Sequence, residues 1–419
     1  MKNSNRSDRK KHTYTKCECL DFVEAVHRKR VYPLMTCHME LAGQLDIECL
    51  KEAVRLSGQI IPEILYAYDF KRARFVDHGY ASEDVVKKTD AITDKAMVWN
   101  LDKGPQLRIF LSGGEGEESV TIGMSHILTD AEGFKQYLYL LCTLYNGWCP
   151  SVPLRNHRKI ALLSDGACLG QATLQTRYGK KVSTALLGKT EGKLQYYNLT
   201  QQINSNDFIK LHTKCRESHV TLNDVFMTAY VRVIARRQNT ERVVIPCPAN
   251  LRSFQKLDGE LTVANMTGLY RRINVEISSG QEFADTLAQI HIEMLLQKSR
   301  YRCFQGLSLL EQQFRRLPHF LLEQIIKVTY RIPPVSYSNF GILDWNKISF
   351  TGCVVNKCYL TGTYRLQPDF QLSVSTFRDT VTLNCVLAGD EVEKEECRNI
   401  LNEVKNELKM CYTIPETNL

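Results

Sequence analysis

The chain has 419 residues, which is too long for one ordinary hydrophobic core, so two domains of about 200 residues each are expected. Apolar residues make up 43% and charged residues 24%, as in ordinary soluble globular proteins. The net charge of +8 suits a phosphate-bearing cofactor or an acidic carrier protein without requiring either, and no apolar run approaches the roughly 18 residues of a membrane span.

Residues 1–12 are basic, but no apolar segment follows them, which argues against a secretory signal. A ragged start is expected there, and no nucleic-acid partner is predicted. The 15 cysteines are interpreted as reduced thiols of a cytoplasmic protein. The closest pairs, Cys17 with Cys19 and Cys353 with Cys358, lack a second pair or a nearby histidine, so no metal site is expected.

The first half of the chain is predicted to mix strands and helices. A helix that begins at Asp46 places Leu50, Ala53, Val54 and Ile61 on one apolar face. The predicted strands of this half lie at residues 36–45, 65–68, 74–76, 107–111 and 118–124. This order predicts a mixed α/β half of about 150 residues.

The stretch between residues 118 and 148 joins a predicted strand to a predicted helix. The helix carries an apolar stripe at Phe134, Leu138, Leu141 and Leu144 or Tyr145, and it ends at Asn146-Gly147. His126, Asp130 and Gly133 lie between the strand and this stripe. A strand that ends in histidine, followed by a turn held by aspartate, forms a rigid platform for proton transfer. On spacing alone, the favoured interpretation is a histidine that only satisfies hydrogen bonds at a strand end.

Residues 149–193 have little pattern and are interpreted as a crossover between two halves, packing over the domain joint or acting as a lid. In the second half, Ser205 is expected to cap a helix, Thr221 to Asp224 form a capping box, and Ser338 to Gly341 form a turn. Further helices are predicted at 281–298, 307–316, 320–330 and 391–410, and strands at 194–199, 243–246, 263–276, 373–377 and 381–387.

The stretch around His126 resembles the HHxxxDG signature of the chloramphenicol-acetyltransferase-like acyltransferases, which include alcohol O-acetyltransferases and condensation domains of peptide synthetases. His126 and Asp130 match its second His and its Asp, whereas Ser125 replaces the first His and Ala131 replaces the Gly. The segments LAGQLDIECLKEAV, TLNDVFMTAYVRVI, PANLR and SNFG resemble other parts of this superfamily, so the resemblance covers nearly the whole chain.

The resemblance implies an α/β (mixed α+β) architecture of two similar subdomains, residues 1–180 and 181–419, each a mixed sheet with flanking helices. A tunnel is expected between them, with His126 as general base and Ser338 assisting the oxyanion. Its wall is expected to include Ser125, Asn339 and Phe340. Ser338 and Asn339 also fit a turn whose side chains bond only their own backbone.

Three more residues are assigned structural roles. The resemblance implies that Asp130 is a structural residue turned away from substrate, and its carboxylate is expected to be partly buried. A buried charge needs a partner, and Arg252 is the candidate because it ends a strand and the resemblance places an arginine near there. Arg252 as an ordinary surface or domain-joint arginine is the alternative. Because Ala131 disfavours positive φ, Gly133 is expected to take up whatever unusual backbone angle the turn needs.

Together these features predict a thioester-dependent acyltransferase that moves an acyl group from acyl-coenzyme A to an alcohol, or to an amine, without a covalent intermediate. No cofactor is expected to stay bound. One alternative is a free-standing condensation-type enzyme that takes its donor from the phosphopantetheine of an acyl carrier protein. Another is an inactive binding protein of the same fold. The acceptor is expected to be apolar, given Phe134, Tyr137 and Phe340 near the motifs, although aromatic residues at such positions more often belong to the hydrophobic core. A serine hydrolase is disfavoured because Ser125 lacks the second glycine of a nucleophile elbow.

Overall fold

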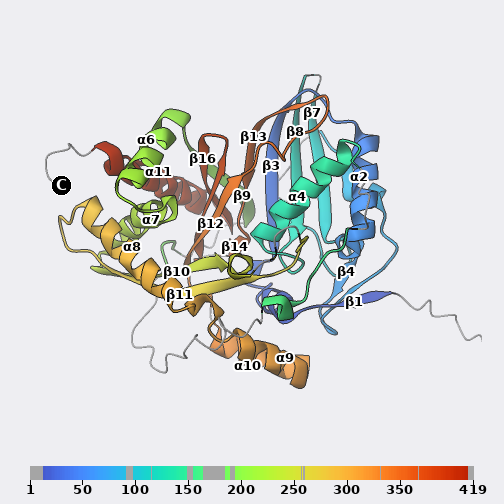
Figure 1. The fold of residues 1–419 in the computed structure, drawn as a ribbon, viewed down its shortest axis with the longest axis horizontal. Helices are drawn as coiled ribbons and strands as arrows, with labels where there is room; N and C mark the ends of the chain where they lie inside the picture. The colour runs from blue at the N-terminus through green and yellow to red at the C-terminus, as the bar shows by residue number, and fades with distance from the viewer. Residues whose placement is uncertain are drawn as a thin grey trace, which may run out of the picture.

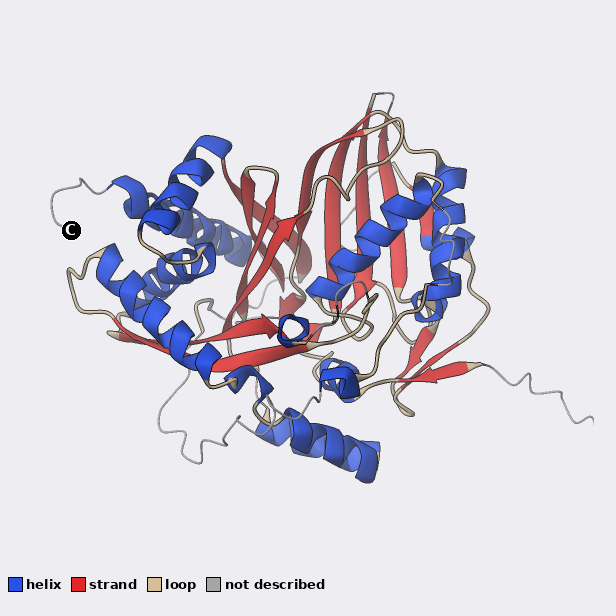
Figure 2. Ribbon diagram, in the orientation of Figure 1, coloured by secondary structure: helices blue, strands red, loops and turns tan. Residues whose placement is uncertain are grey.

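The computed structural model describes residues 13–90, 98–114, 116–148, 154–163, 185–188, 194–255, 257, 260–330, 332–366 and 368–413. Figure 1 shows two lobes side by side, the first built mainly from the N-terminal half and the second from the C-terminal half. Each lobe combines a sheet with helices, which confirms the predicted mixed α/β class (Figure 2). Most of the predicted crossover lies outside the described residues, as does the expected boundary at residue 180.

The first lobe is a five-stranded sheet with helices on one face. Its strand order is β13 (Val354–Leu360), β3 (Leu34–Ala42), β8 (Glu117–Ser125), β7 (Leu107–Gly114) and β6 (Val86–Lys88). The covering helices are α2 (Ile47–Ile60) and α4 (Ala131–Tyr145), which pack against each other. The smaller elements of the N-terminal half are β1 (Tyr14–Lys16), α1 (Cys19–Val26), β4 (Ala67–Asp69), β5 (Arg74–Val76) and α3 (Ser82–Val85).

The second lobe contains a six-stranded sheet. Along its main path the strands are β12 (Val335–Leu343), β15 (Phe370–Phe377), β16 (Thr380–Gly389), β14 (Tyr364–Leu366) and β2 (Val31–Tyr32), and β9 (Gln195–Ile203) also pairs with β16. Its helices are α6 (Ser205–Glu217), α7 (Leu222–Gln238), α8 (Phe283–Ser299) and α11 (Glu391–Thr413). The hairpin of β10 (Arg242–Asn250) and β11 (Thr267–Glu276) runs toward the first lobe, with α9 (Leu307–Arg316) and α10 (His319–Thr329) below it (Figure 1).

The two lobes exchange strands. β13 follows β12 in the chain but pairs with β3 of the first lobe, antiparallel. In return β2, which precedes β3, pairs with β14 at the edge of the second sheet. Both exchanges bring together residues more than 300 positions apart, so neither lobe is a contiguous stretch of sequence. Two hydrophobic cores result, one under each sheet.

Local capping signals account for several helix starts. Asp46 accepts hydrogen bonds from the backbone N–H groups of Glu48 and Cys49, and Thr221 forms the predicted capping box with Asp224. The expectation for Ser205 is wrong by one residue, because Asn204 is the cap and its side chain accepts from the backbone of Asp207.

Two further predictions need correction. The segment from Ser338 to Gly341 is not a turn but part of β12, where the pairing with β15 shifts register between Asn339 and Ile342 and Gly341 has a φ of +70°. The strand predicted to start at Val263 begins only at Thr267 as β11. In both places side-chain hydrogen bonds to distant segments, described below, decide the backbone path.

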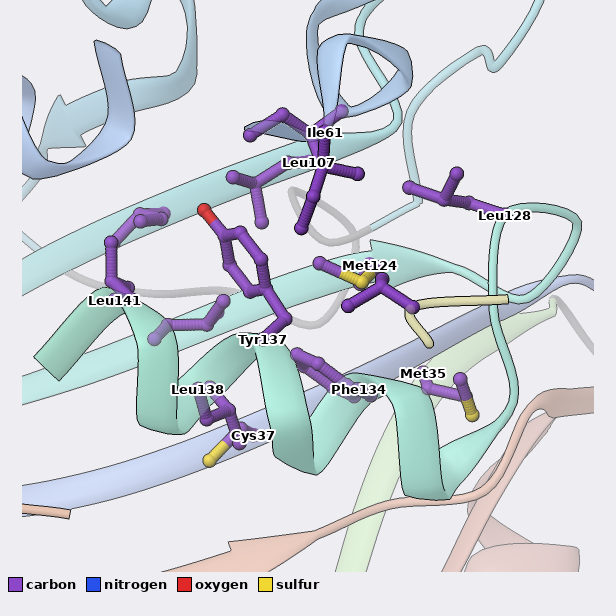
Figure 3. Packing of buried hydrophobic residues seen from close by; sticks show 14 of the residues in the cluster. Met35, Cys37, Ile61, Leu107, Met124, Leu128, Phe134, Tyr137, Leu138 and Leu141 are labelled. Carbon is purple, nitrogen blue, oxygen red and sulfur yellow. The ribbon is translucent and has the colours of Figure 1, made fainter. Parts of the chain in front are cut away.

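The helix α4 fixes the start of the candidate site by its packing. Phe134, Tyr137, Leu138 and Leu141 of this helix lie in one buried cluster with Met124 of β8 (Figure 3). All of these side chains are buried, and each contributes about 1.5–3 kcal/mol by leaving water. Phe134 and Tyr137 therefore belong to the core and do not form the apolar acceptor pocket predicted from them.

Candidate active site

A cavity of about 550 Å³ is lined by residues of both lobes. His126 enters it from the loop between β8 and α4, and Ser338, Asn339 and Phe340 enter it from β12. The helices α1, α9 and α10 supply further walls. Residues more than 200 positions apart in the sequence thus line one cavity.

His126 is held by its backbone at the end of β8. Its N–H donates to the carbonyl of Pro33 at 2.9 Å, and its carbonyl accepts from Nδ2 of Asn265 at 2.9 Å. These bonds join the loop to both the β3 segment and the segment before β11. The side chain, 23% exposed, is thereby directed into the cavity from a fixed backbone.

A carboxylate lies behind the imidazole. Nδ1 of His126 is buried, and it makes no hydrogen bond to any residue that the structure describes. Glu24 of α1 places Oε2 3.8 Å from this Nδ1, and the Glu24 side chain also lines the cavity. A carboxylate on this side favours the tautomer with a proton on Nδ1, which leaves Nε2 as the basic nitrogen.

Asp130 caps α4 and is 2% exposed. Its Oδ1 accepts from the Gly133 N–H at 2.9 Å. Its Oδ2 accepts from Arg252 Nη1 at 3.0 Å, from the Met266 N–H at 2.7 Å and from Thr267 Oγ1 at 2.8 Å. Burial acts to raise the pKa of Asp130, but the Arg252 charge and these donors hold the pKa below its usual range.

Arg252 is buried beside Asp130 and all its donor groups are engaged. Besides Asp130, it donates to Thr262 Oγ1, to the carbonyls of Thr262 and Ala264, and to Asn250 Oδ1, at 2.8–3.2 Å. The ion pair expected from the sequence is present, and Arg252 is not a surface arginine. This network clamps the segment before β11 onto the start of α4, so it fixes the loop that carries His126.

Gly133 has a different role from the one predicted. Neither Ala131 nor Gly133 has a positive φ, because both lie in the first turn of α4. The expectation for Ala131 is correct, and that for Gly133 is wrong. A methyl group at Gly133 would lie 2.1 Å from Thr129 Oγ1 and 3.0 Å from the backbone nitrogen of Ala264. Glycine is needed there because Thr129 and the segment from Thr262 to Ala264 pack closely against the first turn of α4.

Ser125 does not line the cavity, which corrects the expectation that it forms part of the tunnel wall. It is the last residue of β8 and is fully buried, and its Oγ accepts from the N–H of Ile127. Side chains alternate along a strand, so the residue next to a cavity-facing His126 faces the interior.

Ser338 lies in the cavity wall with its hydroxyl oriented by a neighbour. Gln371 of β15 donates from Nε2 to Ser338 Oγ at 2.9 Å. Because Oγ accepts this bond, the hydroxyl hydrogen of Ser338 stays available for another acceptor. Asn339 Nδ2 donates instead to Asn223 at 3.3 Å, and Asn339 Oδ1 accepts from the Gly341 N–H at 2.9 Å, so its amide supports the bulge of β12.

No protein-family profile and no curated protein matches this sequence. Solved structures do match it along nearly its whole length. The condensation domain of the monacolin K polyketide synthase MokA is 14% identical, with coverage of 96% of this chain and 98% of that one and a TM-score of 0.67. The trichothecene 15-O-acetyltransferase from Fusarium sporotrichioides is 10% identical, covers 96% of each chain and gives a TM-score of 0.68. The polyketide synthase associated protein 5 from Mycobacterium tuberculosis is 17% identical, with 94% and 100% coverage and a TM-score of 0.64.

The chain has the two-lobed condensation-domain and acetyltransferase fold. At these identities the comparisons establish the fold alone. Within this fold, the cavity that contains His126 lies between the two lobes, and both lobes contribute residues to its walls.

Sequence reasoning missed three polar residues of the cavity in this acetyltransferase-type fold. Glu24 lies on α1, an element that the pattern did not predict, and Gln371 and Arg365 lie on short or fully buried strands. No sequence spacing identifies these residues. Each contacts its partner through strand pairing or through packing between the lobes, and not through residues that are close in sequence.

Two further properties concern the described residues only. No group of three or more His, Cys, Asp or Glu side chains there could hold a metal ion. None of the helices in that part of the chain is both long and apolar enough to cross a membrane.

Proposed function

We propose that the protein is an acyltransferase that moves an acyl group from a thioester to a hydroxyl or amino acceptor, with His126 as general base. The observation that carries this proposal is that His126 and Ser338 line the same cavity. One supplies a proton acceptor on a fixed backbone, and the other supplies a hydroxyl donor held by Gln371. Acyl transfer needs both.

In the proposed reaction, Nε2 of His126 takes the proton of the acceptor as its oxygen or nitrogen attacks the thioester carbonyl. The C–O or C–N bond forms, and the carbonyl oxygen becomes an oxyanion that accepts a hydrogen bond from Ser338. The intermediate then collapses, the C–S bond breaks, and the thiolate takes the proton from His126. No side chain becomes covalently modified, so the cavity needs no nucleophile.

The donor is proposed to be acyl-coenzyme A, used as a co-substrate. The structural likeness to the MokA condensation domain supports a second candidate, a donor held on the phosphopantetheine of an acyl carrier protein. Both donors present the same thioester to the same cavity. We further propose that the protein acts in the cytoplasm.

Release of free thiol from acyl-coenzyme A in the presence of alcohols or amines tests the proposal, with acyl carrier protein as a parallel donor. His126→Ala is expected to lower turnover by about 10²–10⁴-fold with little change in melting temperature. Ser338→Ala is expected to lower turnover by about 10²–10³-fold. His157→Ala is the matched control, because this histidine pairs with the exposed Glu260 outside the cavity.

Activity with carrier-bound donors alone would select the second candidate. If turnover by His126→Ala stays within about threefold of wild type, well short of the loss expected for a general base, the assignment of the base is wrong. If no donor gives release of free thiol, the result would instead favour an inactive binding protein. The departures from the family motif at Ser125 and Ala131 would then be candidate causes of the lost activity.

A further inference from the structure

Arg365 is a buried arginine at the wall of the candidate active site. It lies on β14, is 8% exposed, and lines the same cavity as His126 and Ser338. Its Nε donates to Gln371 Oε1 at 3.3 Å. Its Nη1 is buried and makes no hydrogen bond within the part of the chain that the structure describes.

The charge of Arg365 is not matched as the charges of other buried arginines are. Arg252 pairs with Asp130 at 3.0 Å, and Arg158 pairs with Asp21 at 2.7 Å. The carboxylate nearest in sequence to Arg365 is Asp369, but its two oxygens accept from Arg30 at 2.6 and 2.7 Å. Burial lowers the pKa of the Arg365 guanidinium, yet arginine remains protonated in proteins.

A buried charge that is not paired with a counter-ion is costly, and such a charge is retained where a ligand supplies the missing counter-charge. A second unsatisfied donor lies near by. Ser336 of β12 is 6% exposed, lines the cavity, and has an Oγ without a hydrogen-bond partner among the described residues. In the strand pairing, Ser336 is opposite Gln371, the residue that accepts from Arg365.

We propose that Arg365, with Ser336, binds a carboxylate of the substrate. A guanidinium matches the two oxygens of a carboxylate in planar, bidentate geometry, which a neutral amide cannot reproduce. Gln371 connects this site to Ser338, since it accepts from Arg365 and donates to the Ser338 hydroxyl. The carboxylate therefore lies one side chain away from the hydroxyl assigned to the oxyanion. The substrate class is a hydroxy or amino acid as acceptor, or a dicarboxylic acyl group as donor.

This inference rests on the proposed function for treating the ligand as a substrate, but its test does not need turnover. Binding of benzoate and hexanoate is measured by calorimetry against the matched amides, benzamide and hexanamide. Wild type is expected to prefer at least one carboxylate over its amide by about 10- to 100-fold. Arg365→Gln is expected to abolish that preference, and Arg365→Lys to keep part of it. His157→Ala is the matched control, because His157 lies outside the cavity, and it keeps the preference in full.

The melting temperature separates a binding role from a structural one. Because Arg365 has no hydrogen-bonded counter-ion, Arg365→Gln is expected to unfold at the same or a higher temperature than wild type. The proposal is overturned if no carboxylate is preferred over its amide, or if Arg365→Gln keeps the preference. A lower melting temperature for Arg365→Gln with unchanged carboxylate binding would show that the arginine only supports the fold.

Two turnover arms then locate the carboxylate. Acetyl-coenzyme A is supplied with 6-hydroxyhexanoate or its methyl ester, and succinyl- or butyryl-coenzyme A is supplied with hexanol. An Arg365-dependent preference in the first arm assigns the carboxylate to the acceptor, and one in the second assigns it to the acyl group. Arg365-dependent binding without turnover in either arm supports the anion site and counts against the proposed function.

Discussion

Replacing Asp130 by Asn removes the charge at the centre of the network that holds the His126 loop. The carboxylate accepts four hydrogen bonds, from Gly133, Arg252, Met266 and Thr267. An asparagine has one oxygen, so its NH₂ group would face donors on the other side. The change therefore leaves the charge of Arg252 uncompensated and at least one donor without an acceptor.

The cost follows from the burial of both partners. Asp130 is 2% exposed and Arg252 is 7% exposed, so water cannot replace the lost acceptor. Breaking a buried ion pair by removing one partner costs about 3–5 kcal/mol, and we expect Asp130→Asn to lower the free energy of unfolding by this amount. Activity is expected to fall as well, because the segment before β11 would no longer hold the loop.

Urea unfolding measures the free energy directly, and a double-mutant cycle isolates the pair. The single variants Asp130→Asn and Arg252→Met are compared with the double variant, which should lose less than the sum, by about 0.5–3 kcal/mol. Asp46→Asn is the matched control. Asp46 also caps a helix, but it is exposed and has no buried arginine, and asparagine caps equally well.

Three results would refute this reasoning. A loss below about 1 kcal/mol for Asp130→Asn would mean that the buried pair does not stabilise the fold as argued. Strict additivity in the cycle would mean that the two side chains act independently. A fully stable but inactive Asp130→Asn protein would assign the carboxylate to the chemistry instead of the loop.

Three further outcomes are expected. Gly133→Ala should cost about 1–3 kcal/mol in unfolding free energy, because its methyl group meets backbone atoms, whereas Ala131→Gly should cost at most about 1 kcal/mol; similar losses in the two would contradict the packing argument. The pKa of Asp130 is lowered on folding, so its contribution to stability is present above about pH 4 and lost as pH falls through the folded pKa. As the pH is lowered, the free energy of unfolding of wild type should thus fall more steeply than that of Asp130→Asn. If the two proteins show the same dependence on pH, the ionised Asp130 does not contribute to stability as argued. Glu24→Gln should lower kcat at least about threefold with an unchanged melting temperature if Glu24 orients His126, and an unchanged kcat would remove it from the site.

The sequence alone determined features that depend on a few neighbouring residues. The caps at Asp46 and Thr221, and the strand, loop and helix around His126, follow from periodicity and side-chain bonding within one turn. Such interactions span three or four residues, so they leave a readable spacing. The pairing of Arg252 with Asp130 was reached differently, through resemblance to a known motif, since 122 residues separate the two.

The tertiary structure decided what the cavity contains. In the sheet of the second lobe, β15 pairs with β12 and β16, and β14 pairs with β16 on its other side. Within this sheet Arg365, Gln371 and Ser338 form one hydrogen-bonded chain. Glu24 reaches His126 only because α1 packs beneath the lobes. Part of the constraint on Gly133 is also tertiary, because an added methyl group would meet not only Thr129 Oγ1 but also the backbone of Thr262 and Ala264, more than 100 residues away. Contacts across such distances depend on how whole elements pack, and packing imposes no period on the sequence.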